Sequence, residues 1–394
     1  MSELNLPIGY GRQSIDDDDR QAVLAVLNSD FLTQGPAVDA FEQALAKRLD
    51  VKHVIAVTNG TAALHLACLA SGLQAGDLAV TSTLTFLATA NGPLYCGAQT
   101  HLLDIDPKHG GMSETALRAF LKKHPDCKVV LPIHFAGLSG DMKMVREISG
   151  HRIIIEDACH ALGGTYENGR PIGSCCYSDM TVFSFHPVKP ITTGEGGVVT
   201  TNDDALAKVL KMLRNHGIER EQEHFIKTPT ADIGPWSYEQ QILGFNYRMS
   251  DLQAALGESQ LKKLDDFRLR RQKIAGIYDA YFKDIAHIAP YQCLPNQREH
   301  SGLHIYVLLI DFDAIGMSRG EVMLALREKG IGTQVHYIPV HRQPYHIDQG
   351  NFEKEAFPIA EDHYSRFLTI PLFPTMSDLE AQYVCDQIVN ITTT

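Results

Sequence analysis

Short apolar runs alternate with helix-like segments through the first half of this chain. The runs occupy residues 54–57, 78–82, 100–103, 128–134, 153–157, 180–185 and 198–201. Strands that alternate with helices predict an α/β fold, with a mainly parallel sheet covered by helices on both faces. Ligands bind such sheets beyond the carboxyl ends of the strands, so we expect the chemistry where these runs end.

The remainder of the chain predicts a second, smaller unit. One long helix is expected from Asp251 to Tyr281, interrupted at Gly257. A strand, a helix and a second strand are expected at 305–310, 318–329 and 331–335. We therefore predict a large domain with the N-terminal segment at residues 1–250, and a bridging helix with a small C-terminal α+β domain at 251–394.

The stretch from 219 to 246 has no clear hydrophobic periodicity. It is polar and aromatic, and it predicts a long loop. Loops of this length inside a compact domain are often functional.

Composition narrows the function classes. The chain has 394 residues and a net charge of −12, and no Lys/Arg-rich run occurs, which argues against nucleic acid as the main partner. The eight cysteines are irregularly spaced without a C-x-x-C pair, so we expect reduced thiols. Residues 1–10 lack the parts of a signal peptide, and no run of about 18 apolar residues occurs. A cytoplasmic protein that does not cross a membrane is expected.

The segment Ser184–Gly197 holds the most informative residue. Lys189 stands between Pro187 and Pro190, so it is expected on a stiff loop at a strand end and outside any helix. The hydroxyls and glycines that follow it would let a ligand approach the backbone closely. Such a lysine suits Schiff-base chemistry with an aldehyde cofactor. A lone lysine in a polar loop is usually only a surface residue, so the assignment depends on its partners.

Those partners match the needs of pyridoxal phosphate. The cofactor requires a lysine, a carboxylate at its pyridine nitrogen, amides and hydroxyls for its phosphate, and a flat side chain over its ring. The candidates, in that order, are Lys189, Asp157, the Gly60–Thr61 helix start with Ser184, and Phe86. Each signal alone is weak or moderate, since an acid at a strand end usually caps a turn and most glycine turns bind nothing. Together they predict a cofactor site, in which a depressed lysine pKa would help proton transfer.

Seven segments resemble the DegT/DnrJ/StrS-type sugar aminotransferases, which have fold type I of the pyridoxal phosphate enzymes. They are residues 32–35, 59–64, 85–91, 156–158, 184–197, 214–217 and 244–249. The resemblance implies that Lys189 carries the cofactor. It implies a cofactor site of Gly60, Thr61, Phe86, Asp157, His160, Ser184, Lys189 and Asn246.

The resemblance also implies an assembly and a reaction type. Asn246 would reach the cofactor of a neighbouring subunit, so a homodimer with shared sites is expected. His160 matches a position that is often Gln and would lie near the cofactor hydroxyl. A related branch has His in place of the lysine and performs deoxygenation, so Lys189 favours transamination over dehydration.

Within the family, the chain resembles a branch of pseudaminic acid synthesis that aminates C4 of a UDP-linked 4-keto-6-deoxy-N-acetyl-hexose. The similar segments are 32–35, 186–193 and 335–337. The same resemblance implies a substrate site lined by Tyr10, Asp30, Phe31, Leu32, Thr33, Gly60, Ser184, Gln334, Val335, His336 and Tyr337. Interface packing is an equal alternative for Tyr10 and Tyr337. Residues 341–346 differ from that branch, which leaves the stereochemistry of the sugar open. No metal is expected at the histidines of this loop, because transamination needs none.

We thus expect a homodimeric, pyridoxal phosphate-dependent aminotransferase that uses L-glutamate as amino donor and a nucleotide-linked keto-sugar as acceptor. Two alternatives are a C3 aminotransferase or a dehydratase on the same scaffold. A third is a non-catalytic regulatory homologue. A decayed scaffold should have lost Lys189 or Asp157, and both are present.

Overall fold

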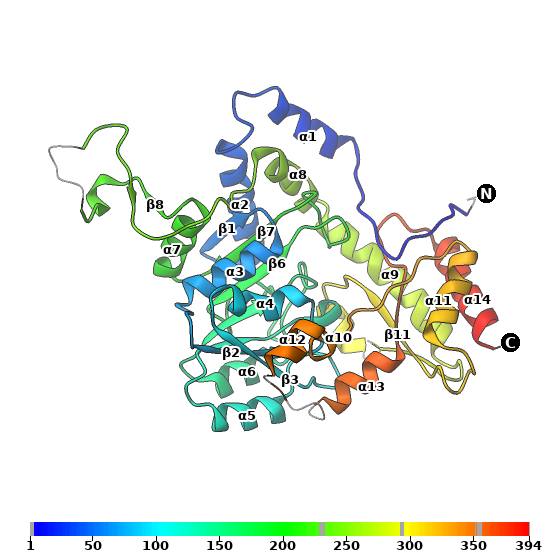
Figure 1. Ribbon diagram of the computed structural model, residues 1–394. Coiled ribbons are helices and arrows are strands. Elements are labelled where there is room, and N and C mark those ends of the chain that lie inside the picture. Colours follow the sequence, from blue (N-terminus) through cyan, green and yellow to red (C-terminus); the bar gives the residue numbers. More distant parts are fainter. Residues whose placement is uncertain (1–3, 228–232, 292–294, 351, 353–356, 394) are drawn as a thin grey trace.

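The computed structural model describes residues 4–227, 233–291, 295–350, 352 and 357–393. In these ranges the centre is a seven-stranded sheet in the order β1-β7-β6-β5-β4-β2-β3 (Figure 1). Its strands are β1 (His53–Val57), β2 (Leu78–Ser82), β3 (Gln99–Leu103), β4 (Val129–Leu131), β5 (Ile153–Asp157), β6 (Met180–Ser184) and β7 (Gly197–Thr201). Only β7 runs antiparallel to its neighbours β1 and β6; the other pairs are parallel. The predicted α/β class with a mainly parallel sheet is confirmed.

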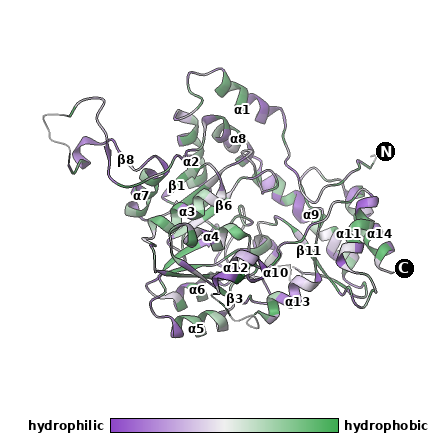
Figure 2. Cartoon of the chain, in the orientation of Figure 1, coloured by the Kyte–Doolittle hydropathy of each residue, from purple (hydrophilic) through white to green (hydrophobic). Residues whose placement is uncertain are grey.

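Helices cover both faces of this sheet, because successive strand side chains point to opposite faces. On β5, Ile154 packs with one core cluster and Ile155 with the other. The first cluster includes α2 (Pro36–Leu49), α5 (Glu114–Lys123) and α6 (Met142–Ser149). The second includes α3 (Gly60–Ala70), α4 (Leu87–Tyr95) and α7 (Asp204–Arg214). Helix α3 is apolar nearly all round and buried, and it is coloured green with β6 in Figure 2.

A smaller sheet follows in the second half of the chain. Strands β10 (Ile288–Pro290), β11 (Tyr306–Ile310) and β12 (Phe367–Ile370) form an antiparallel sheet in that order. Helices α9 (Leu264–Phe282), α11 (Arg319–Glu328) and α14 (Asp378–Thr392) share its core. The remaining helices are α1 (Asp17–Leu27), α8 (Asp251–Leu261), α10 (Pro295–His300), α12 (Pro344–Gln349) and α13 (Pro358–Arg366). The division at residue 250 stays a prediction.

The predicted long helix from Asp251 is in fact two helices. It breaks at Lys262 and Lys263, between α8 and α9, and not at Gly257. Gly257 serves close packing instead: a Cβ there would lie 2.7 Å from Phe41 Cζ and 2.8 Å from Thr193 Cγ2.

Two predicted strands differ from the structure. The run at 128–134 forms only a short β4, because Pro132 has no N–H to continue the ladder. The prediction of a strand at 331–335 is wrong. Ile331 bridges Ile8 while Gln334 bridges Thr369, so the two ends pair with different segments and no continuous ladder forms.

The described residues of the stretch predicted as a long loop, 219–227 and 233–246, are mostly irregular as predicted, and they are called the arm below. Short strands β8 (Ile218–Glu219) and β9 (Glu239–Gln240) pair antiparallel at its base. Figure 1 shows the segment after β8 extending away from the sheet. Across the described ranges, no helix combines the length and the apolar character that a membrane crossing requires.

Candidate active site

A cavity of about 1140 Å³ lies at the carboxyl edge of the large sheet. Its walls come from segments that follow β1, β2, β4, β5 and β6, and from residues near the smaller sheet. Sequence-predicted residues in its lining are Tyr10, Gly60, Thr61, Phe86, Asp157, His160, Ser184, Lys189, Gln334, Val335, His336 and Tyr337. The edge at which the strands end is therefore the edge at which the candidate residues meet.

Lys189 lies on a loop that is stabilised by hydrogen bonds between its own residues. Its amide donates to the His186 carbonyl at 2.9 Å, and Thr192 Oγ1 donates to the Phe185 carbonyl at 3.0 Å. The Gly194 amide donates to Thr192 Oγ1 at 2.9 Å. The sequence suggested that the Thr192 hydroxyl would face a ligand, but in the structure it holds the loop together.

Burial lowers the pKa of the Lys189 amine from its ordinary value, and the neighbouring Cys159 and Asp157 partly oppose that shift. A lower pKa increases the neutral fraction of the amine, which is the form that attacks an aldehyde.

Asp157 ends β5 with both carboxylate oxygens oriented. Thr89 Oγ1 donates to Oδ2 at 2.5 Å, and the Cys159 amide donates to Oδ1 at 3.1 Å. Thr85 Oγ1 lies 2.8 Å from Thr89 Oγ1 and extends the network. Sequence reasoning missed Thr89; the only signal was two threonines four residues apart at the start of a helix. A carboxylate held in this way suits a fixed, protonated ring nitrogen.

The N-terminus of α3 provides an anion cradle. Asn59 Oδ1 accepts the Ala62 amide at 2.8 Å, while the Gly60 and Thr61 amides have no acceptor among the described residues. A Cβ at Gly60 would lie 2.9 Å from Ser184 Cβ, so glycine lets Ser184 approach the helix start. Free amides at a helix N-terminus, together with a hydroxyl, fit a phosphate.

Phe86 immediately precedes α4 and stays 56% exposed at the cavity. Its ring centroid lies 5.9 Å from that of Tyr337. An exposed aromatic side chain in this position suits covering a flat ring.

Three histidines line the cavity on the side of the smaller sheet. Burial lowers the pKa of His160 and of His304 well below the ordinary value, and it lowers the pKa of His336 to about 3. The Lys189 charge adds to each of these shifts. All three imidazoles are therefore neutral near pH 7.

The structure does not bring five predicted residues into this cavity within one chain. Asp30, Phe31, Leu32 and Thr33 lie exposed beyond α1, and Phe31 is 55% exposed. Asn246 is also exposed and pairs with Asn215 through an isolated bridge. Their roles stay predictions.

The histidines of the 336–346 loop have protein partners. His336 Nδ1 lies 2.9 Å from Thr369 Oγ1, and His346 Nε2 lies 3.2 Å from Asn91 Oδ1. The two ring nitrogens of His341 contact Thr83 Oγ1 and Glu361 Oε1, each at 2.6 Å. These histidines anchor the loop that carries Tyr337.

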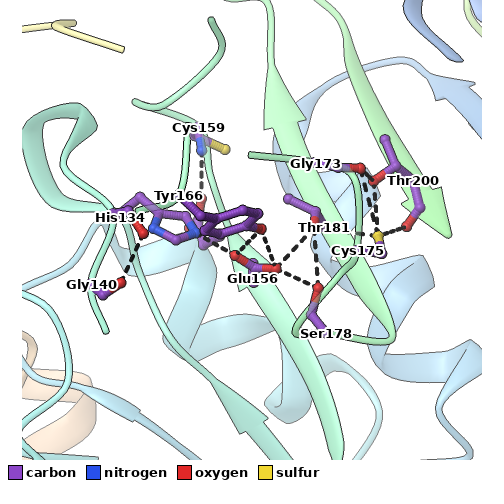
Figure 3. Close-up of polar contacts among 12 residues, drawn as sticks. His134, Gly140, Glu156, Cys159, Tyr166, Gly173, Cys175, Ser178, Thr181 and Thr200 are labelled. Atoms are coloured by element: carbon purple, nitrogen blue, oxygen red, sulfur yellow. Dashed lines mark hydrogen bonds and ion pairs between the residues drawn. The ribbon is translucent and has the colours of Figure 1, made fainter. Parts of the chain in front are cut away.

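The neighbouring Glu156 is fully buried, and because successive strand side chains alternate it points to the face of β5 opposite to Asp157. Figure 3 shows the polar contacts around its carboxylate. His134 Nε2 lies 2.6 Å from one carboxylate oxygen, and the Tyr166 hydroxyl donates to both oxygens at 2.8 Å. Ser178 and Thr181 donate as well. The network ties the segment after β4 to β5 and so fixes the backbone of Asp157. Glu156 belongs to the similar segment 156–158, but no sequence pattern indicated this role.

The residues present fit pyridoxal phosphate. An amine of lowered pKa, an oriented carboxylate, an open helix N-terminus and an exposed aromatic ring converge on one cavity. This fold and this site define the class of pyridoxal phosphate-dependent enzymes of fold type I.

Comparisons with known proteins identify the family. Residues 13–389 match the model of the DegT/DnrJ/EryC1/StrS aminotransferase family. The spore coat polysaccharide biosynthesis protein SpsC of Bacillus subtilis is 38% identical over 97% of this chain and 96% of its own. The UDP-4-amino-4,6-dideoxy-N-acetyl-beta-L-altrosamine transaminase of Campylobacter jejuni is 35% identical over 98% of this chain and 97% of its own.

A solved structure supports the same family. Helicobacter pylori PseC, an aminotransferase of pseudaminic acid biosynthesis, aligns with a TM-score of 0.87 and 30% identity, covering 98% of this chain and 99% of its own. Solved structures of the same fold carry pyridoxal phosphate or its amine form. The chain belongs to the DegT/DnrJ/EryC1/StrS aminotransferase family and is a pyridoxal phosphate-dependent sugar aminotransferase.

Proposed function

We propose that this enzyme transfers an amino group from L-glutamate to C4 of a UDP-linked 4-keto-6-deoxy-N-acetyl-hexose, in bacterial surface-sugar synthesis of the pseudaminic acid type. The observation that carries the proposal is the convergence of Lys189 and Asp157 on a cavity of about 1140 Å³. The names of PseC and of the Campylobacter transaminase support the acceptor and the pathway. SpsC, which is 38% identical, has a name that specifies no substrate, so product analysis has to decide.

Each cavity residue has a role in this proposal. Lys189 would bind the cofactor, remove the proton at Cα of the amino donor and later deliver a proton at C4 of the sugar. Asp157 holds the proton on the pyridine nitrogen. The Gly60 and Thr61 amides and the Ser184 hydroxyl bind the phosphate, and Phe86 covers the ring. When bound, the cofactor supplies the electron sink.

We also propose a homodimer with shared sites. In one chain, Asn246 and residues 30–33 lie exposed outside the cavity. The arm exposes Ile226, Trp236 and Leu243 by 67%, 77% and 80%. Exposed apolar side chains of this size on a projecting segment favour burial against a second copy. A cytoplasmic location remains part of the proposal.

The test is a product analysis. The enzyme is incubated with ¹⁵N-labelled L-glutamate and the UDP-linked 4-keto-sugar, and NMR locates the label. We expect ¹⁵N on C4, and no product from Lys189→Ala. A label on C3 would establish the C3 alternative, and loss of a hydroxyl without label transfer would establish the dehydratase.

A further inference from the structure

Tyr337 and His160 form a polar pair in the cavity wall. The Tyr337 hydroxyl oxygen lies 2.7 Å from His160 Nε2. Both residues line the cavity, and their rings are stacked with centroids 5.9 Å apart. The position of the proton in this bond decides what the tyrosine can do.

The backbone of Ala136 determines which ring nitrogen of His160 carries the proton. Its backbone amide donates to His160 Nδ1 at 3.2 Å. Ala136 is fully buried and has a φ of 56°, a left-handed conformation that is rare for a residue with a Cβ. Because Nδ1 accepts a hydrogen bond, a neutral imidazole must carry its proton on Nε2.

His160 is neutral at working pH. Burial lowers its pKa well below the ordinary value, and the charges of Lys189 and His336 lower it further. Nε2–H therefore donates to the Tyr337 oxygen. The tyrosine stays protonated, since burial and then the charges of Asp157, Cys159 and Tyr10 raise its pKa well above the usual range. Its own O–H is left to donate to a third group in the cavity.

Strand order indicates which group that is. Along the sheet, the Gly60 helix follows β1, Ser184 ends β6, Asp157 ends β5, and Ala136 follows β4. The phosphate cradle and the His160–Tyr337 pair thus lie on opposite sides of Asp157. In pyridoxal phosphate, the phosphate arm and the phenolic oxygen stand on the two ring carbons that flank the ring carbon bearing the aldehyde, with which the lysine reacts. A phosphate at Gly60 therefore directs the phenolic oxygen toward the pair.

We propose that Tyr337 donates its hydroxyl hydrogen bond to the phenolic oxygen of the cofactor, and that His160 is a positioning residue which acts through Tyr337. This inference rests on the assignment of Lys189, Asp157 and Gly60 in the proposed function. The negative phenolic oxygen favours a proton on the Lys189 nitrogen once that nitrogen is joined to the cofactor. A donated hydrogen bond draws off part of that charge and eases release of the proton.

The test is a pH titration of the visible absorption band of the cofactor-loaded protein. Tyr337→Phe removes the donor and keeps the ring, so its midpoint should rise by about one pH unit, the effect of one hydrogen bond to a charged group. Tyr95→Phe is the matched control, because Tyr95 lines the cavity on the His65 side and should leave the midpoint unchanged.

Variants of His160 separate a direct role from a positioning role. His160→Gln can accept the Ala136 amide and donate to Tyr337, so it should keep the wild-type midpoint. His160→Leu should raise the midpoint, and adding it to Tyr337→Phe should cause no further rise. A further rise in the double variant would make His160 the direct donor and overturn the inference.

Two results distinguish failure of this inference from failure of the site assignment. An unchanged midpoint in Tyr337→Phe, with cofactor bound, overturns the inference and leaves the proposed function intact. A band that survives in Lys189→Ala overturns the lysine assignment, and this inference with it.

Discussion

Single residues at strand ends carry the chemistry of this site, and the two central ones were predictable. Lys189 follows one apolar run and Asp157 ends another, and the carboxyl ends of parallel strands share one edge. Thr89 and Ala136 were not predictable, because their roles depend on tertiary neighbours that local sequence does not specify. Thr89 donates to a carboxylate 68 positions away, and Ala136 donates to a ring 24 positions away.

The lowered pKa of Lys189 predicts the pH dependence of cofactor capture. The neutral amine exists above its pKa, so the capture rate of cofactor-free enzyme should rise with pH through a midpoint below the ordinary 10.5. Asp157→Asn should move the midpoint lower, because the carboxylate favours the charged amine. Stopped-flow absorbance at a series of pH values checks both. A wild-type midpoint at or above 10.5 would contradict the account.

Removing the Thr89 hydroxyl should weaken the hold on Asp157. Thr89→Val deletes a hydrogen bond to a charged oxygen, and we expect turnover to fall about ten- to hundredfold. Steady-state kinetics and cofactor titration measure this loss. Thr100→Val is the control: its hydroxyl donates to the Ala90 carbonyl at 2.8 Å, outside the cavity lining, so turnover should be kept. Equal losses of turnover in both variants would mean that Thr89 contributes only to folding and not to the site.

At the scale of elements, most helices and strands of the large sheet follow from hydrophobic period and capping residues. Ser250 caps α8, for example, with the reciprocal bonds of a capping box. Three features could not be predicted in this way. They are the break between α8 and α9, the absence of a strand at 331–335 and the pairing of β8 with β9. Each depends on a partner segment distant in sequence, which a local period cannot reveal.

Two helical glycines provide a matched stability test. A Cβ at Gly257 on α8 would meet Phe41 at 2.7 Å and Thr193 at 2.8 Å, whereas a Cβ at Gly276 on α9 would meet open space. Gly257→Ala should therefore destabilise the protein by about 1–3 kcal/mol through overpacking. Gly276→Ala should stabilise it by up to about 1 kcal/mol, through reduced backbone entropy of the unfolded chain. Denaturant unfolding measures both, and equal effects would refute the packing role of Gly257.

At the scale of the whole molecule, the sequence predicted a cofactor site where the strands end, and a substrate site lined by residues from both ends of the chain. It did not predict which residues one chain brings into the cavity. Residues 30–33 and Asn246 resemble site residues of the family, yet they lie outside the cavity of a single chain. Residues that a second copy would supply cannot be located from the fold of one chain.

Mixed subunits test whether Asn246 acts across the proposed dimer. Lys189→Ala and Asn246→Ala subunits, each inactive alone, should regain activity when unfolded and refolded together, because each hybrid contains one complete site. Mixing Lys189→Ala with Asp157→Asn is the control and should stay inactive, since both residues serve the cavity of the same chain. Asn246→Ala that is fully active alone would show that Asn246 has no role in the site.

The most direct test of Lys189-based amino transfer is the absorption spectrum of the purified, cofactor-loaded enzyme before and after addition of L-glutamate. We predict a near-visible band that fades as the amino group moves to the cofactor, that returns with the keto-sugar, and that is missing in Lys189→Ala. A band that ignores L-glutamate would contradict the donor, and the lack of any band after cofactor is supplied would contradict the site itself.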